Sequence, residues 1–412
     1  MRELIGWRCL VALGLLGFGA GPAALADIVM PPTTPGQRDF VEWCASERQA
    51  ADTKSALARL AAALKPGTWA VLNKDGDESG YGAKFTDSGV GGLFGYASKA
   101  AYDPVRRRVY FFGSGHHNMN SPEHYAAIIK FIVYEVDRNR WTRLRTPQWY
   151  LDTGSKGGNS HGYQYQTIAK GQFFRMNLGP PARKSTVQVC NIDKDKVEDI
   201  DPKDDWKESV DVPFTFSSGP LEYFPERNSL ITINTRASEV YERELAATKW
   251  VKLAKVAGMN YFGIAASHNP VYKVVVFGGG SQAAPPWTNI RKWYVLNAKG
   301  EVTPLDDSPV DSYAATSTLF TVDPVSGRHL LIRPNDFDYK KTTGYWFYEL
   351  DVSKKPGSQW TRRKDLEAAI PQFNARSRKH VFNTVVVPLP EYGINMYMGP
   401  SNVWIYKHAS QQ

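Results

Sequence analysis

The sequence has few cysteines and no long apolar run beyond its first 26 residues. Three cysteines occur in 412 residues, and none stands in a Cys-x-x-Cys or Cys/His spacing, so we expect no structural zinc. Without a later stretch of about 18 uninterrupted apolar residues, no membrane-spanning helix is expected. The chain also lacks a recognisable RNA- or DNA-binding motif, so nucleic acid is not an expected partner.

The first 26 residues have the pattern of a secretory signal. Arg2 and Arg8 flank the start, Leu10–Phe18 forms a short apolar core, and Ala24 and Ala26 satisfy the small-residue rule for cleavage. The core is too short to span a bilayer, which disfavours a membrane anchor. We therefore predict cleavage near Ala26 and a periplasmic or extracellular location.

Charge and composition restrict the class of partner. The net charge is +9, so an exported chain of this kind is biased towards anionic partners, such as an acidic glycan or another envelope component. A generally solvated basic surface is the alternative explanation. Aromatic residues make up 13% of the chain, with 34 glycines and 26 prolines, which is typical of many strands and tight turns. We expect a monomer.

Residues 27–67 are predicted to form an extended leader followed by a helix. The helix is expected over Arg38–Leu64. Its second half, Asp52–Leu64, is capped by Asp52 or Thr53 and has Leu57, Leu60, Ala61 and Leu64 on one face. Cys44 in this leader and Cys190 form a candidate disulfide, because an oxidising compartment would allow them to pair. The acidic loop Asp75–Glu78 is explained more simply as a turn than as an ion site, so no metal or cofactor is predicted.

A four-stranded unit spans Ala101–Leu144 and recurs along the chain. In five copies a proline stands just before an apolar strand, where its fixed φ suits a hairpin turn. These prolines are Pro104, Pro225, Pro270, Pro324 and Pro390. A sixth copy has Lys170-Gly171 in place of the proline. The average spacing is close to the ~40–50-residue period of propeller repeats.

The repeats also share a tryptophan after the turn into their outer strand, and one has a glycine run after its second strand. The tryptophans are Trp141, Trp206, Trp250 and Trp360, and the run is Gly278–Gly280. This pattern resembles the kelch repeat, whose family includes the central domain of galactose oxidase. The resemblance implies an all-β propeller over residues 68–408, with six blades or, alternatively, seven. Thr68–Leu72 would complete the last unit and close the ring.

One mouth of such a propeller is formed by the second-to-third strand loops and the links into each inner strand. Histidine, tyrosine and arginine gather in these segments. The candidate catalytic residues are His116, His161, Tyr163, Tyr261 and Arg175. The candidate substrate-binding residues are Arg236, Arg333, Asn234, Asn335, Trp149, Trp287, Phe337, Tyr339 and His380.

These residue types suit β-elimination on a uronic-acid polysaccharide. Arginine would neutralise the sugar carboxylate, a histidine or tyrosine would remove the adjacent proton, and a second would protonate the leaving oxygen. The candidate base is His116 or His161, and the candidate acid is Tyr163 or Tyr261. Arg175, with Arg236 or Arg333, would form the clamp. A glycosidase is disfavoured, since its paired carboxylates are missing from these segments. In fold and residue type the chain resembles propeller-fold polysaccharide lyases.

Two other functions remain open. A non-catalytic propeller could bind an envelope glycan or protein, as many kelch propellers do. A copper oxidase like galactose oxidase is a minor alternative, because its cofactor needs a Tyr–Cys crosslink and neither Cys44 nor Cys190 is expected at the mouth. Each candidate also has a structural explanation: the asparagines in turns, Arg175 between blades, and the tryptophans in blade packing.

Overall fold

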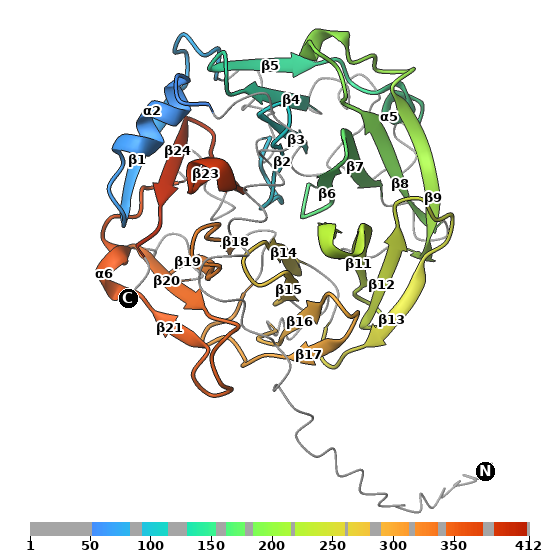
Figure 1. Ribbon diagram of the computed structural model, residues 1–412, viewed down its shortest axis with the longest axis vertical. Helices are drawn as coiled ribbons and strands as arrows, with labels where there is room; N and C mark the ends of the chain where they lie inside the picture. The colour runs from blue at the N-terminus through green and yellow to red at the C-terminus, as the bar shows by residue number, and fades with distance from the viewer. Residues whose placement is uncertain are drawn as a thin grey trace, which may run out of the picture.

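The computed structural model describes residues 52–82, 93–113, 130–153, 162–177, 184–215, 219–259, 263–280, 290–312, 318–336, 343–373 and 383–409. Within these residues, six four-stranded antiparallel sheets are arranged as the blades of a closed ring (Figure 1). This confirms the all-β propeller with six blades and rules out the seven-bladed alternative. No helix among the described residues is long and apolar enough to cross a membrane.

Each blade runs outward from an inner strand, and its strands are adjacent in chain order. Blade one contains β2 (Ala101–Asp103), β3 (Arg108–Gly113), β4 (Lys130–Glu135) and β5 (Arg140–Leu144), and blade two contains β6 (Gln166–Ala169), β7 (Gln172–Asn177), β8 (Lys184–Asn191) and β9 (Trp206–Thr215). Blade three contains β10 (Leu221–Phe224), β11 (Ser229–Asn234), β12 (Glu239–Glu244) and β13 (Val251–Lys255), and blade four contains β14 (Ala265–Asn269), β15 (Val274–Gly278), β16 (Trp293–Asn297) and β17 (Val302–Pro304). Blade five contains β18 (Leu319–Val322), β19 (His329–Pro334), β20 (Tyr345–Leu350) and β21 (Trp360–Arg362).

The sixth blade joins the two ends of the propeller. It contains β22 (Val385–Leu389), β23 (Ile394–Met398) and β24 (Asn402–Lys407), and β1 (Thr68–Lys74) supplies its outer strand. Trp69 of β1 pairs with Tyr406 of β24, and their rings stack with centroids 4.5 Å apart. The predicted closing strand is confirmed and extends two residues beyond Leu72. Pairing with β1 covers the edge of β24 and joins the N-terminal end of the propeller to its last blade (Figure 1).

All five repeated prolines lie in the turn between the first and second strands of a blade, as predicted. Two of these turns are short 3₁₀ segments, η4 (Pro225–Arg227) and η5 (Pro390–Tyr392). Each ends on a left-handed residue, Asn228 at φ 47° and Gly393 at φ 63°. Asparagine and glycine tolerate this conformation better than other residues, so the turn chemistry explains why the hairpins close there.

The repeated tryptophans lie at the start of the outer strands and pack between blades, which confirms their predicted role. Trp141 contacts Tyr134 of its own blade and Tyr81 of the segment after β1, with ring centroids 4.9 and 5.0 Å away. Its indole Nε1 donates a hydrogen bond to Asn73 Oδ1 at 3.0 Å. The buried ring is thus satisfied both by packing and by hydrogen bonding.

Among the described residues, three helices lie toward the outside of the ring (Figure 1): α2 (Ala56–Ala63), α5 (Gln148–Thr153) and α6 (Lys364–Glu367). The predicted cap of the second half of the helix was wrong by two or three residues, because Ser55 and not Asp52 or Thr53 is the N-cap, and its Oγ accepts from the Ala58 amide at 3.0 Å. The first half of the predicted helix lies outside the described residues. Asp52 instead accepts from the amides of Lys54 and Ser55. Further along, Asp77 accepts from the amides of Lys74 and Ser79, so the acidic loop is a turn, as predicted. A third 3₁₀ segment among the described residues is η3 (Val197–Asp199).

Candidate functional site

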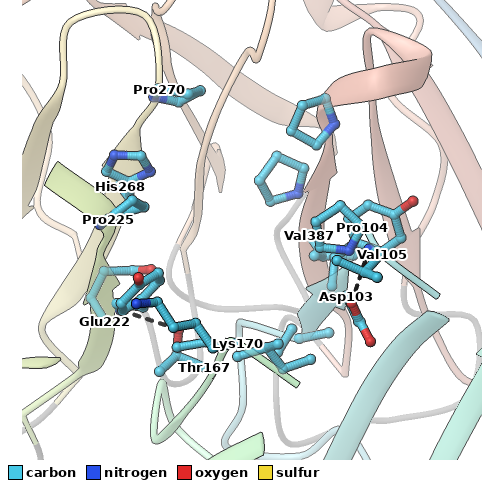
Figure 2. A pocket seen from close by; sticks show the side chains of 18 of the residues that line it. Asp103, Pro104, Val105, Thr167, Lys170, Glu222, Pro225, His268, Pro270 and Val387 are labelled. Carbon is cyan, nitrogen blue, oxygen red and sulfur yellow. Dashed lines mark hydrogen bonds between the residues drawn. The ribbon is translucent and has the colours of Figure 1, made fainter. Parts of the chain in front are cut away.

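A pocket of about 560 Å³ occupies the central channel on the side of the first-to-second strand turns. All six blades contribute to it, through their inner strands and the turns that follow them. Its volume lies in the ~300–1,000 Å³ range of small-ligand sites. Figure 2 shows Pro225, Pro270 and His268 on one side and Pro104, Val105 and Val387 on the other.

The floor of this pocket carries an ion pair that joins distant blades. Lys99, in the link before β2, reaches blade three, where its Nζ lies 2.5 Å from Glu222 Oε2 and 3.1 Å from the Leu221 carbonyl oxygen. The two side chains are only 14% and 9% exposed. Thr167 lies beside them, and its Oγ1 accepts from the Tyr223 amide at 3.2 Å. We call Lys99, Thr167 and Glu222 the floor triad.

Behind the floor triad, hydrogen bonds cross the centre of the ring. Gln164 donates to Ser98 Oγ at 3.0 Å and accepts from the Ala266 amide of blade four at 2.6 Å. Val386 of blade six exchanges backbone hydrogen bonds with Ser98 and Ala100. Gln166 donates to the Lys99 carbonyl oxygen at 2.7 Å. These contacts hold the link that carries Lys99 in place, so the floor is rigidly supported.

The rim holds charged groups that are mostly paired. Arg106 lies between Asp103 and Asp193 and forms an ion pair with each. Burial raises the pKa of Asp103, although Arg106 and two turn amides oppose that shift. His268 lies 2.9 Å from Glu226, and this contact outweighs burial so that the pKa of Glu226 is lowered. Lys170 is exposed and makes no ion pair within the described residues.

Arg175 and Tyr163, both predicted to be catalytic, are buried among other side chains. Arg175 in β7 is 2% exposed, and its guanidinium carbon lies 4.7 Å from the centre of the Phe112 ring in the neighbouring blade. Burial lowers its pKa to about 10. Tyr163 forms a parallel bridge with Ala97 and packs edge-on against Tyr165. Both positions fit the bracing of neighbouring blades.

The other described candidates also have structural contacts. Arg333 donates to the Asp311 carbonyl oxygen at 2.9 Å and lies over the Trp346 ring. Asn335 bonds Thr343 across its loop, and Asn234 accepts from the Arg236 and Ala237 amides. Trp149 packs on Phe112 and Trp206. Arg236 is exposed in the β11–β12 turn, at the opposite end of its blade from the pocket.

Several predicted residues lie outside the described part of the chain, and their roles stay predictions. They are His116, His161, Tyr261, Trp287, Phe337, Tyr339, His380 and Cys44. Cys190 is buried, and burial raises the pKa of its thiol. Because Cys44 lies outside the described residues, the candidate disulfide stays a prediction. The described residues contain no cluster of three or more metal-ligating side chains.

The floor triad was missed, although the repeat contains a signal for part of it. The residue three positions before the hairpin-turn proline, or before Lys170 in the proline-free copy, lines the pocket in five blades. These residues are Ala101, Thr167, Glu222, Ser267 and Val387. Glu222 is the charged member of that series, so aligning the turns would have identified it. Lys99 has no such signal, because it lies in a link and reaches across the ring.

Comparison with known proteins identifies no family for the chain. No protein-family model matches the chain, and no curated protein matches it. Solved structures similar to it include a protein of unknown function from Bacteroides thetaiotaomicron (11% identity, 82% of this chain and 75% of that one, TM-score 0.48). TolB from Acinetobacter baumannii (9%, 72% and 63%, 0.41) and YCF48 bound to D1 peptide (10%, 84% and 99%, 0.40) are also similar.

Proposed function

We propose that this protein is an exported binding propeller whose ligand presents an anionic group to the channel pocket. The floor triad is the observation that carries the proposal. The Lys99 ammonium has three donors, and Leu221 and Glu222 accept two of them, which leaves one N–H without a partner among the described residues and so open to a ligand. Thr167 accepts through its Oγ1 and keeps its own hydroxyl proton to donate. The nearby Lys170 adds a second positive charge.

The described residues favour binding over the lyase alternative. A carboxylate clamp must reach the sugar, but Arg175 is buried against Phe112 and Arg333 donates to backbone oxygens. A buried guanidinium that moved to the surface would leave an unfilled space and expose its aromatic neighbours. A lyase remains testable with a panel of acidic polysaccharides. We expect no rise in the near-ultraviolet absorbance of an unsaturated sugar, and a rise lost in Arg175→Ala and His161→Ala variants would establish the lyase instead.

Two simple probes test the binding proposal directly. Hexanoate and hexylammonium share an alkyl chain and differ in the sign of their charge. We expect hexanoate to bind with a Kd of about 1 mM, since ~0.5 kcal/mol per heavy atom is reasonable for so small a ligand. Protein-observed NMR would follow both probes in the wild type and in Lys99→Met.

The matched control is Lys252→Met, which removes the same charge from the outer strand β13, far from the channel. Lys252 is half exposed and pairs with Glu239 at 3.3 Å. Hexanoate binding should be lost in Lys99→Met and retained in Lys252→Met. Preferential binding of hexylammonium, or binding that neither variant alters, would contradict the proposal.

A further inference from the structure

The walls of the channel pocket indicate which class of anionic ligand it takes. Resting on the proposed function, we infer that the ligand is an extended acidic peptide segment of a partner protein. This segment would insert a glutamate or aspartate side chain, with apolar residues on either side of it. The carboxylate would reach the floor triad while its apolar neighbours contact the rim.

The walls are apolar and rigid. Pro104, Val105, Pro225, Pro270 and Val387 line the two sides of the opening (Figure 2). Proline rings and branched aliphatic side chains offer contact area without hydrogen-bond donors, which suits aliphatic side chains of a ligand. The proline φ angles are already fixed, so little conformational entropy is lost when a ligand binds.

The same walls suit a sugar poorly. A sugar ring carries hydroxyl groups all round, and each buried hydroxyl needs a partner. Three polar groups on these walls are already engaged: Tyr102 donates its hydroxyl to Glu391, Tyr223 donates to Asn228, and Asp103 accepts from the Val105 and Arg106 amides. A peptide side chain needs polar partners only at its charged end.

The polar end of the ligand has a matching site at the floor. The remaining Lys99 N–H and the Thr167 hydroxyl are donors, and Lys170, Thr167 and Glu222 all lie in the lower half of the view in Figure 2. At the floor, Lys99 and Lys170 stand against Glu222, whereas at the rim Asp103 and Asp193 stand against Arg106. The excess positive charge is therefore confined to the floor, where it attracts a carboxylate. Arg106 at the rim does not compete for the ligand, since two carboxylates already flank it.

The size of the pocket also favours a narrow insert. A cavity of about 560 Å³ cannot admit a folded domain, whereas a short extended segment fits. The inner-strand turns of the six blades surround the opening, so only a protruding side chain and its neighbours would reach the floor. This geometry gives specificity through apolar packing at the rim and one charge-assisted contact below.

A library of random linear peptides displayed on phage tests the inference. Peptides are selected on the whole protein, with Lys99→Met for counter-selection and Lys252→Met as the matched control. We expect the selected peptides to share a glutamate or aspartate beside apolar residues. A synthetic peptide with that acid changed to its amide should bind at least about tenfold more weakly. Lys99→Met and Thr167→Val should each weaken the original peptide, while Lys252→Met stays within about twofold.

The alternative results have distinct meanings. Peptides with a shared lysine or arginine, whose binding depends on Glu222 and not Lys99, would overturn the inference. If tetraglucuronate binds in a Lys99-dependent way and no acidic peptide does, the inference fails while the proposed function stands. If neither binds and hexanoate is also inactive, both fail. Thermal unfolding of each variant, monitored by circular dichroism, shows that it is folded before its affinity is compared.

Discussion

Two ionic groups join distant parts of the chain: the Lys99–Glu222 pair in the channel pocket, and the Arg363–Glu349 pair beside the ring closure. Arg363 donates to Glu349, to Asp365 at 3.0 and 2.7 Å, and to the Ala409 carbonyl oxygen at 2.7 Å. His408 Nε2 lies 3.1 Å from Glu349 Oε1. Lys99, by contrast, keeps one donor unused within the described residues.

The difference separates a structural charge from one suited to recognition. In the ring-closure group, Arg363 and Glu349 are enclosed and each has several partners, which is the arrangement a buried ion needs to be tolerated. The Arg363 and Glu349 side chains are 4% and 2% exposed. The pocket pair is nearly as buried but faces a cavity. An unfilled hydrogen-bond site facing a cavity can bind a ligand, whereas a saturated group away from any cavity can only stabilise the fold.

Glu349→Gln should produce the largest loss of stability. The change leaves Arg363 and His408 facing a neutral amide inside the protein, and removing one partner of a buried pair costs roughly 3–5 kcal/mol. Urea unfolding followed by tryptophan fluorescence measures this loss.

Asp307→Asn is the matched control for Glu349→Gln. Asp307 pairs with Lys292 at 2.9 Å, and both side chains are about half exposed. Such surface pairs contribute ~0–1 kcal/mol. Equal losses in the two variants would mean that the Arg363–Glu349 group is hydrated in solution and does not support the closure.

His329→Gln should reduce the loss of stability in acid. His329 is fully buried, stacked on Phe320 and 3.1 Å from Asn269, and burial lowers its pKa to about 3. The unfolded state therefore takes up a proton below its usual pKa of ~6.5, while the folded state does not. Stability should fall as the pH drops from that value towards 3.

The size of this effect follows from the pKa difference. Between pH 6.5 and pH 4 it amounts to about 3 kcal/mol, since each pH unit corresponds to ~1.4 kcal/mol. The measurement is urea unfolding of wild type and His329→Gln at several pH values. The two stability curves should converge as the pH falls, because only the wild type loses the contribution of His329, while the carboxylates titrate alike in both proteins. Curves that remain parallel would show that His329 has the same pKa in the folded and unfolded states.

Single changes at the floor triad should destabilise the protein less than Glu349→Gln does. They should weaken ligand binding more than Glu349→Gln does. Lys99→Met or Glu222→Gln is expected to cost ~1–2 kcal/mol, because the group left behind can gain water from the cavity. In a double-mutant cycle, the double variant should be less destabilised than the sum of the single variants by about 1 kcal/mol. Additive losses would indicate that the ion pair is not formed in solution.

The architecture could be predicted because local rules repeat in every blade. Pro104, Pro225 and their counterparts mark one turn, and Trp141 with its counterparts marks another, so an error at one copy is corrected by the others. The second blade shows this, because it has no proline in its first turn but was still recognised from the other copies. Its turn is made instead by Lys170 and Gly171, which both adopt positive φ angles. The start of α2 was missed because Asp52 and Ser55 are both good capping residues and only tertiary contacts choose between them.

The site was harder to predict because residue type says little about side-chain direction. Arg175 and Arg333 lie close to the strand ends where a mouth was expected. The strand register, however, points the Arg175 side chain towards Phe112 of the neighbouring blade and the Arg333 side chain towards the Asp311 carbonyl oxygen. A one-residue change of register would have faced them the other way. Lys99 is the opposite case, since its importance depends on a contact with blade three that no local pattern contains.

Arg236→Ala should have the smallest effect on stability and on ligand affinity. The variant tests whether the ligand binds at the pocket or at the opposite end of the channel. Arg236 is exposed in the β11–β12 turn, whereas the pocket opens among the first-to-second strand turns at the other end of the blades. An exposed change of this kind alters stability by ~0.5 kcal/mol or less. Affinity for the selected acidic peptides should also stay within about twofold, as fluorescence anisotropy would show. A tenfold loss would move the binding site to the mouth where histidine, tyrosine and arginine were predicted to gather, and it would leave the floor triad as a purely structural cross-link.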